Sequence, residues 1–388
     1  MQESFLGTLI IRPTMNALFG RNLINPKALQ TNNFKICIET SEVSVYGVKL
    51  KSNGFPHSMQ DAESIKCAET TIWALMEYFS SKYMEYKPVL PSEILKTLER
   101  ITFERQLPSR GLTMNEISFA LRQFGFGTKI YSQNQYEENL SLIIDCYVES
   151  GIPILLGLEA ISDEGEGHVV ICIGKENNCD VKLGKKELYT SFGVQKYFYD
   201  ACNNNSRYVV QDDNLQPYQL IHLNNPGEHY KGDEKNNYKI DSIIVPLYPK
   251  VYLDSVLAKD IFLELLGDSK TGNNFKSPLV LRRLLASSRS FKEHVAGLKM
   301  EQKLKATFLA LKMPKFVWIA ELYDKEKYSI VNSTIVGLII VDATEANNIP
   351  FDSLIFAGYP EVCHIRNENN FVNLPIKFQD YVTYNNLR

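Results

Sequence analysis

Three residue types that together perform thiol chemistry occur in order along this chain: Cys67, His168 and Asp212. Cys67 stands where an apolar helical run begins, and the free N–H groups of a helix start favour a thiolate. A histidine can take the proton of such a thiol, and a carboxylate can orient the imidazole and stabilise its charged form. The order is therefore that of a nucleophile, its base and an orienting acid.

Each of these residues also has an ordinary structural interpretation. Free cysteines are most often small core residues, and Cys67 could be one of them. His168 opens the apolar segment HVVICIG, where a hydrogen-bonded core histidine would also fit. The segment RYVVQDD ends in two acids, and strand geometry alone does not separate Asp212 from Asp213. If Cys67 is catalytic, we expect its sulfur within about 4 Å of a ring nitrogen of His168.

The elements that would position these residues follow an α+β order. Residues 5–50 are rich in β-branched and aromatic residues, which predicts strands. Helical spacing of apolar residues then predicts helices, and Thr113 with Glu116 forms a capping box for the third of them. The helices are expected at 67–79, 91–100, 113–125 and 140–151, and buried strands at 151–159, 168–174 and 207–213.

The rest of the chain, from residue 226, mixes strands and helices. Strands are predicted at 240–248, 316–323, 333–344 and 353–359, and helices at 252–267, 278–287 and 290–312. Because both chain ends are rich in strands, we expect the N-terminal strands to pair with the C-terminal ones. The predicted units are 1–55 (β-rich), 56–225 (the unit with the three residues) and 226–388 (α+β).

Composition and charge exclude several classes of protein. The net charge is −3, without the excess of basic residues that marks binding to nucleic acid. Seven cysteines without a CxxC pair speak against a zinc ribbon or a disulfide framework. No apolar run is long enough for a membrane span, and the start of the chain lacks the pattern of a signal peptide. We therefore expect a cytoplasmic protein with reduced thiols, no cofactor and no membrane partner.

The cysteine at a helix start, the strand GHVVICIG and the stretch DDNLQPY resemble the papain-like cysteine peptidase superfamily. The nearest branch is that of the bacteriocin-processing, double-glycine (C39-like) peptidases, and the resemblance covers roughly residues 56–225. It implies a papain-like fold, in which a helix bundle packs on an antiparallel sheet. It also implies that Cys67 is the nucleophile, His168 its base and Asp212 the orienting acid. Asp213 is then expected to cap the turn before Asn214.

The resemblance implies an oxyanion donor as well, a glutamine upstream of the cysteine. The candidate is Gln60, seven residues before Cys67, whereas the family has its glutamine six residues before, where this chain has Asp61. Ala68 stands where the family has a glycine after its cysteine.

The expected function is that of a cysteine hydrolase, a peptidase or amidase, that acts on a peptide or protein through a thioester intermediate. Two alternatives stay open: an acyltransferase of the same fold, and an interaction module that has lost turnover, which the shifted Gln60 and Ala68 favour. Residues 226–388 are expected to bind a protein partner. The sequence does not specify the substrate or the oligomeric state.

Several other residues receive structural interpretations. Cys37 and Cys172 alternate with apolar neighbours and are expected in the core. His57 either lines the same cleft as Gln60 or is an ordinary loop histidine. The remaining histidines show no ligand spacing with cysteines or acids, so no metal site is predicted; they are His222, His229, His294 and His364.

Overall fold

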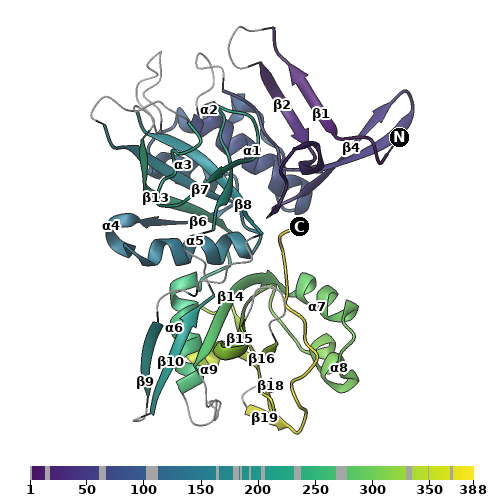
Figure 1. The fold of residues 1–388 in the computed structure, drawn as a ribbon, viewed down its shortest axis with the longest axis vertical. Helices are drawn as coiled ribbons and strands as arrows, with labels where there is room; N and C mark the ends of the chain where they lie inside the picture. The colour runs from purple at the N-terminus through teal and green to yellow at the C-terminus, as the bar shows by residue number, and fades with distance from the viewer. Residues whose placement is uncertain are drawn as a thin grey trace.

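A computed structural model of the chain shows a mixed α+β architecture with several antiparallel sheets and helices on them (Figure 1). The structure describes residues 2–13, 18–60, 67–101, 112–162, 166–177, 183, 186–191, 194–201, 206–230, 237–267, 278–328, 334–347, 349–367 and 370–388.

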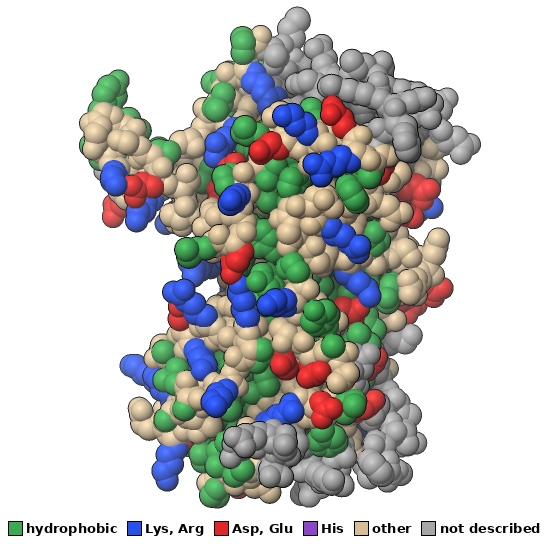
Figure 2. Space-filling model, turned by 180° about the vertical axis from the view of Figure 1, so that it is seen from behind, with side chains coloured by type: hydrophobic (Ala, Val, Ile, Leu, Met, Phe, Trp, Pro, Cys, Tyr) green, Lys and Arg blue, Asp and Glu red, His purple; other side chains and the backbone are tan. Residues whose placement is uncertain are grey.

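Two hairpins and a short helical turn form the N-terminal part. β1 (Gly7–Ile11) pairs with β2 (Phe19–Ile24), and β4 (Glu39–Val45) pairs with β5 (Val48–Gly54); a 3-10 turn, η1, covers Pro26–Ala28. The β4–β5 turn is made by Tyr46 and Gly47, both with positive φ, which suits a two-residue hairpin loop. This hairpin projects from the body of the molecule (Figures 1 and 2).

The seven-stranded sheet contains His168, is followed at the end of one strand by Asp212, and is antiparallel throughout. Its order is β12-β11-β8-β7-β13-β6, with β3 paired to β8. The strands are β3 (Phe34–Ile36), β6 (Gly127–Ser132), β7 (Ile154–Ala160), β8 (His168–Glu176), β11 (Tyr208–Gln211), β12 (Gln219–Ile221) and β13 (Tyr238–Leu247). The predicted strands of this region are confirmed, whereas β6 and β12 were not expected.

Helices pack on this sheet, namely α1 (Cys67–Lys82), α2 (Pro91–Leu98), α3 (Met114–Gln123), α4 (Gln133–Tyr136) and α5 (Asn139–Glu149). Apolar residues of α1, α2, α3 and α5 are buried, as their periodicity predicted, whereas the short α4 was not expected. Ile72, Leu75 and Met76 of α1 are buried in the core. The predicted capping box of α3 is confirmed, since the Thr113 and Glu116 side chains accept from each other's backbone N–H groups.

The second large sheet has eight strands in the order β19-β18-β17-β16-β15-β14-β10-β9, and only the β10–β14 pair in it is parallel. Its strands are β9 (Lys186–Ser191), β10 (Val194–Asp200), β14 (Leu279–Ser287), β15 (Phe316–Asp324), β16 (Ile335–Asp342), β17 (Leu354–Gly358), β18 (Cys363–Asn367) and β19 (Asn370–Leu374). The helical segments around it are α6 (Ser255–Gly267), α7 (Ser288–Gly297), α8 (Gln302–Ala310), η3 (Lys325–Lys327) and α9 (Pro350–Ser353).

One predicted helix is wrong. Residues 278–287 were expected to be helical, but Leu279–Ser287 is strand β14, hydrogen-bonded to β15 on one side and β10 on the other. Leucine, arginine and alanine are good helix formers, so local propensity favours a helix here. Nearly every residue of β14 is buried, and this tertiary environment overrides the local preference.

The sheets divide the chain differently from the expected boundaries. β13, which lies beyond residue 225, belongs to the seven-stranded sheet, whereas β9 and β10, which precede it, belong to the eight-stranded sheet. The N-terminal strands in the described part of the chain pair with one another or with β8, and not with the C-terminal strands as expected. The chain ends do meet at one point, where the backbones of Ile36 and Arg388 exchange two hydrogen bonds of 3.0 and 3.1 Å.

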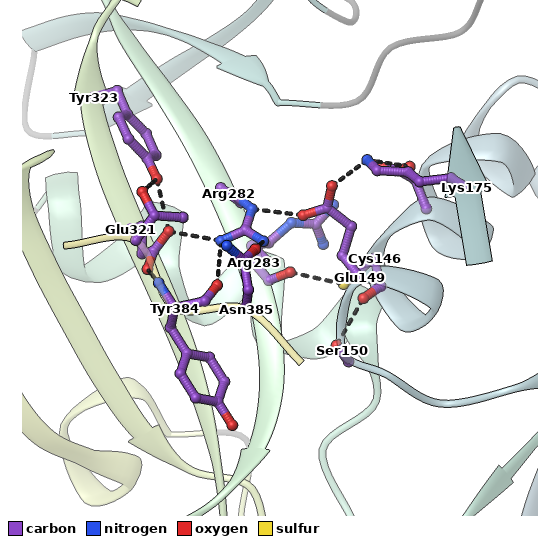
Figure 3. Close-up of polar contacts among 12 residues, drawn as sticks. Cys146, Glu149, Ser150, Lys175, Arg282, Arg283, Glu321, Tyr323, Tyr384 and Asn385 are labelled. Carbon is purple, nitrogen blue, oxygen red and sulfur yellow. Dashed lines mark hydrogen bonds and ion pairs between the residues drawn. The ribbon is translucent and has the colours of Figure 1, made fainter. Parts of the chain in front are cut away.

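A largely buried ionic network joins the two large sheets (Figure 3). Lys175 of β8 pairs with Glu149 at the end of α5, and Glu149 accepts from Nε of Arg282 in β14 at 2.5 Å. Arg282 also donates to Glu321 of β15 at 2.8 Å, and Glu321 accepts from the backbone N–H of Tyr384 near the C-terminus. Lys175 lies on the strand that begins at His168, so this network ties that strand to the second sheet.

The surface shows no single-sign stripe on the face drawn in Figure 2, where basic and acidic described side chains are interspersed. Among the described residues, no helix combines the length and the apolar character needed to cross a bilayer.

Candidate active site

Cys67 is the first residue of α1 and is half-buried, whereas the other described cysteines, Cys37, Cys146, Cys172 and Cys363, are buried. Burial raises the pKa of Cys37 and Cys363 to about 11 and that of Cys146 to about 12, and it raises the pKa of Cys172 further. The core positions expected for Cys37 and Cys172 are confirmed. Of the described thiols, Cys67 is thus the one open to a reagent.

His168 begins strand β8, and its side chain is buried. Its Nε2 atom lies 3.0 Å from Oδ1 of Asp212, and the side chain of Cys67 is close enough to interact with the imidazole. Burial would lower the pKa of His168, but the charge of Asp212, the hydrogen bond to Asp212 and the interaction with Cys67 raise it well above its ordinary value. The three residues named first from the sequence therefore lie together.

Strand pairing explains why Asp212 reaches His168. β11 runs antiparallel beside β8, with Gln211 opposite Ile171, so the residues that follow Gln211 arrive at the end of β8 where His168 lies. The sequence predicted a strand beside the histidine strand, and this pairing confirms it.

The carboxylate of Asp212 is fully buried and accepts from four donors. Oδ1 receives Nε2 of His168 and the backbone N–H of Asn214, at 3.0 and 2.9 Å. Oδ2 receives the hydroxyl of Tyr230 and Nε2 of His229, at 2.5 and 2.7 Å. Burial alone would raise the pKa of Asp212, but the charge of His168 and these hydrogen bonds hold it well below its ordinary range.

His229 and Tyr230 are site residues that sequence reasoning missed. Both come from the polar loop after β12, and His229 was judged only by its spacing to metal-type ligands. Their contact with Asp212 spans 17 and 18 residues, without a helical or strand period to reveal it. The signal present in the sequence was the pair of polar, ring-bearing residues in a loop with glycine and proline.

Asp213 is expected from the sequence to cap the turn before Asn214, but the structure shows that it does not. The backbone N–H of Asn214 goes to Asp212 instead, and the Asp213 side chain is buried with Oδ1 3.7 Å from Nε2 of His168. Burial and the nearby charge of Asp212 raise the pKa of Asp213 to about 7, although the charge of His168 and an interaction with Thr70 oppose the shift.

Gln60 lies at the edge of this cluster. Its backbone N–H donates to the carbonyl of Asp213 at 3.0 Å, and its side-chain amide donates to Oδ1 of Asn214. Asn214 in turn lies 3.4 Å from His168, through its Nδ2 atom, and donates to the hydroxyl of Tyr230. The Gln60 amide is thus engaged by Asn214. Asp61, the residue at the family's usual offset, lies outside the described residues.

His57 is a buried residue beneath the cluster. Its Nδ1 atom accepts from Nδ2 of Asn22 at 3.0 Å, so Nε2 carries the proton and donates to the backbone carbonyl of Asp212 at 3.1 Å. Burial lowers the pKa of His57, which keeps it neutral in this role. His57 therefore fixes the position of the Asp212 backbone through this hydrogen bond.

The donor atoms of His168, Asp212 and Asp213 lie within 4.8 Å of one another, the kind of cluster that can ligate a metal. The four donors to Asp212 already match the four lone-pair positions of a carboxylate. A cation would have to displace them, so the residues fit a hydrogen-bonded proton network better than a metal centre.

Comparison with known proteins gives little more. No family model matches the chain, and no curated protein matches it. Among solved structures, it is similar to the crystal structure of the peptidase domain of Streptococcus ComA, described as a bi-functional ABC transporter involved in a quorum-sensing pathway. The identity is 11% and the TM-score 0.27, over 49% of this chain and 96% of that domain. With so low a score, a functional assignment depends on the geometry of the site.

Proposed function

We propose that this protein is a cysteine hydrolase of the papain-like kind, in which Cys67 is the nucleophile, His168 the base and Asp212 the orienting acid. The arrangement that carries the proposal is that one buried imidazole, that of His168, lies 3.0 Å from a carboxylate oxygen of Asp212 and is close enough to the side chain of Cys67 for the thiol to raise its pKa. A histidine held between a thiol and a carboxylate is the arrangement that activates a thiol for attack on an acyl carbon.

The reaction follows from these contacts. His168 takes the thiol proton, and the thiolate of Cys67 attacks the carbonyl carbon of an amide or ester. His168 then gives its proton to the leaving amine or alcohol, which leaves a thioester on Cys67. His168 next takes a proton from water, the hydroxide attacks the thioester, and the acid product and the free thiol are released. Asp212 stabilises the imidazolium in each half-reaction.

Oxyanion stabilisation would come from the backbone N–H of Cys67 and the side-chain amide of Gln60. The Gln60 amide is bound to Asn214 in the structure, so it would have to leave that partner when an acyl group enters. A peptide or protein is the substrate class that we propose.

The test is site-specific alkylation of the full chain with iodoacetamide, followed by trypsin and mass spectrometry. The tryptic peptide Cys67–Lys82 contains Cys67 as its single cysteine, so its labelling reports this thiol alone. We expect rapid labelling of this peptide, slowed about 10-fold or more in His168→Gln. Equal alkylation rates in wild type and His168→Gln would refute His168 as the base of Cys67.

A second candidate, an interaction module without turnover, is favoured by the engagement of Gln60 with Asn214. Thioester trapping separates it from an enzyme. Incubation with activated acyl esters should add the acyl mass to the peptide Cys67–Lys82, and hydroxylamine should remove it. A reactive Cys67 that never acylates would favour the binding module. An acyl group that passes to an added amine faster than to water would indicate an acyltransferase.

A further inference from the structure

Two neighbouring carboxylates face one imidazole in this site. Oδ1 of Asp212 lies 3.0 Å and Oδ1 of Asp213 lies 3.7 Å from the same atom, Nε2 of His168. Both side chains are buried, at 0% and 5% exposure. Two carboxylates that share a buried site rarely ionise together, because each charge raises the cost of the other. The surroundings of the two carboxylates therefore determine which of them is ionised.

The surroundings of the two acids differ in their hydrogen-bond donors. Asp212 receives four, of which His229 and Tyr230 bind Oδ2 and leave Oδ1 for His168 and the Asn214 backbone. In the described part of the chain, neither side-chain oxygen of Asp213 has a partner within close hydrogen-bond geometry, although Thr70 is near enough to interact. Donors stabilise the ionised form of a carboxylate, so they favour charge on Asp212.

We propose that His229 and Tyr230 are positioning residues that make Asp212, and not Asp213, the charged partner of His168. The inference deepens the proposed function, since Asp212 is the acid assigned there to orient the base. Without these two donors, Oδ2 of Asp212 would be a buried, unpaired oxygen, and the advantage of Asp212 over Asp213 would shrink.

The contacts of His229 assign it as a donor to Asp212. Its Nε2 atom must carry a proton to bind the carboxylate, while Nδ1 is buried and has no hydrogen-bond partner in the described part of the chain. His229 therefore acts on Asp212 as a hydrogen-bond donor that fixes the orientation of its carboxylate.

The experiment is a titration of the aspartate side-chain carbons by NMR, with 13C-labelled aspartate in the full chain. Asp212→Asn and Asp213→Asn assign the two signals. In the wild type we expect Asp213 to titrate near pH 7, matching its raised pKa of about 7, and Asp212 to stay ionised to lower pH. In the double variant His229→Leu/Tyr230→Phe, the Asp212 titration should rise by about one pH unit or more, and that of Asp213 should fall.

Single variants and a control keep this result interpretable. His229→Gln retains an N–H donor and should titrate like the wild type, whereas His229→Leu should not. Tyr218→Phe removes a buried hydroxyl that bonds to the Ile24 carbonyl, and should leave both signals unchanged. If Tyr230→Phe and the double variant titrate like the wild type, the selection of Asp212 by these residues is overturned.

The outcome is separable from that of the proposed function. Changed titrations with an unreactive Cys67 would support the charge selection and refute the hydrolase. A Cys67 that depends on His168, together with unchanged titrations, would support the hydrolase and overturn the role of His229 and Tyr230.

Discussion

Nε2 of His168 lies 3.0 Å from Oδ1 of Asp212, although 44 residues separate them in the chain. Two paired strands, β8 and β11, bring the imidazole and the carboxylate together, and Tyr230 and His229 hold the far side of the carboxylate. Each link of this arrangement leads to a measurable consequence.

Replacing Asp212 by asparagine should slow the alkylation of Cys67. An asparagine keeps the shape but removes the charge that stabilises the imidazolium, and the amide cannot satisfy all four donors around Asp212. In a Ser-His-Asp enzyme, the equivalent change lowered kcat by about 10⁴. We expect a loss of at least about 10-fold here, because a thiolate depends less on its base than a serine does. The rate for the peptide Cys67–Lys82 measures it.

Asp213→Asn is the matched control for Asp212→Asn, because Asp213 is the neighbouring acid beside the same imidazole. At about pH 6, Asp213 is already protonated, so its replacement should change the alkylation rate by less than about 3-fold. If Asp213→Asn slows Cys67 more than Asp212→Asn does, the orienting acid has been assigned to the wrong residue.

The stability of Asp213→Asn should depend on pH with a definite sign. The pKa of Asp213 is raised to about 7 in the folded state, from an ordinary value of 3.8. Between these values the unfolded chain loses its proton before the folded chain does, so the contribution of Asp213 to stability falls as the pH rises to about 7. Relative to wild type, Asp213→Asn should therefore gain several degrees in Tm from pH 4 to pH 8. A flat difference between the two Tm curves would contradict the raised pKa.

Removing the central cation of the buried network should destabilise the fold. Arg282→Ala leaves the buried Glu321 and the half-buried Glu149 without their arginine partner, and breaking a buried pair such as Arg282–Glu321 typically costs about 3–5 kcal/mol. Arg289→Ala is a matched control, because Arg289 pairs with Glu293 on the exposed surface of α7. That change should cost less than about 1 kcal/mol. Urea unfolding measures the free energy of unfolding of both variants. Equal losses would contradict a larger stabilising contribution of the network than of an exposed ion pair.

Gln60→Ala tests the oxyanion donor that the family resemblance implies. If the amide leaves Asn214 to bind the oxyanion, its loss should lower the rate of thioester formation by about 10²-fold or more. The alkylation of Cys67 by iodoacetamide, which forms no oxyanion, should change little. A loss of acylation no larger than that of alkylation would indicate that another group supplies this donor.

Much of the site could be predicted from the sequence because its three main residues begin or end regular elements. The apolar periodicity after Cys67 and the apolar run after His168 predicted α1 and β8, and the antiparallel order predicted the approach of Asp212. Spacing could not reveal Tyr230 or His229, since their contact with Asp212 is made across a loop. The same holds for Asp213, whose burial depends on how the turn after β11 packs.

The second sheet was harder to predict than the first. β14 is built from helix-forming residues, and its burial between β10 and β15 decides its conformation. β9 and β10 were missed; they pair with each other as a hairpin, and β10 also pairs in parallel with β14, which lies far away in the sequence. Pairing of this kind depends on tertiary contacts rather than on local preference.

The dependence of Cys67 on His168 is tested most directly by the rate of alkylation of the peptide Cys67–Lys82 as a function of pH, in wild type and His168→Gln. An imidazolium beside the sulfur stabilises the thiolate, so wild type should still react at about pH 6, at least about 10-fold faster than the variant. At high pH, where any exposed thiol ionises, the two rates should converge. Two superimposable profiles from about pH 6 upward would contradict the pairing of Cys67 with His168, and with it the proposed hydrolase.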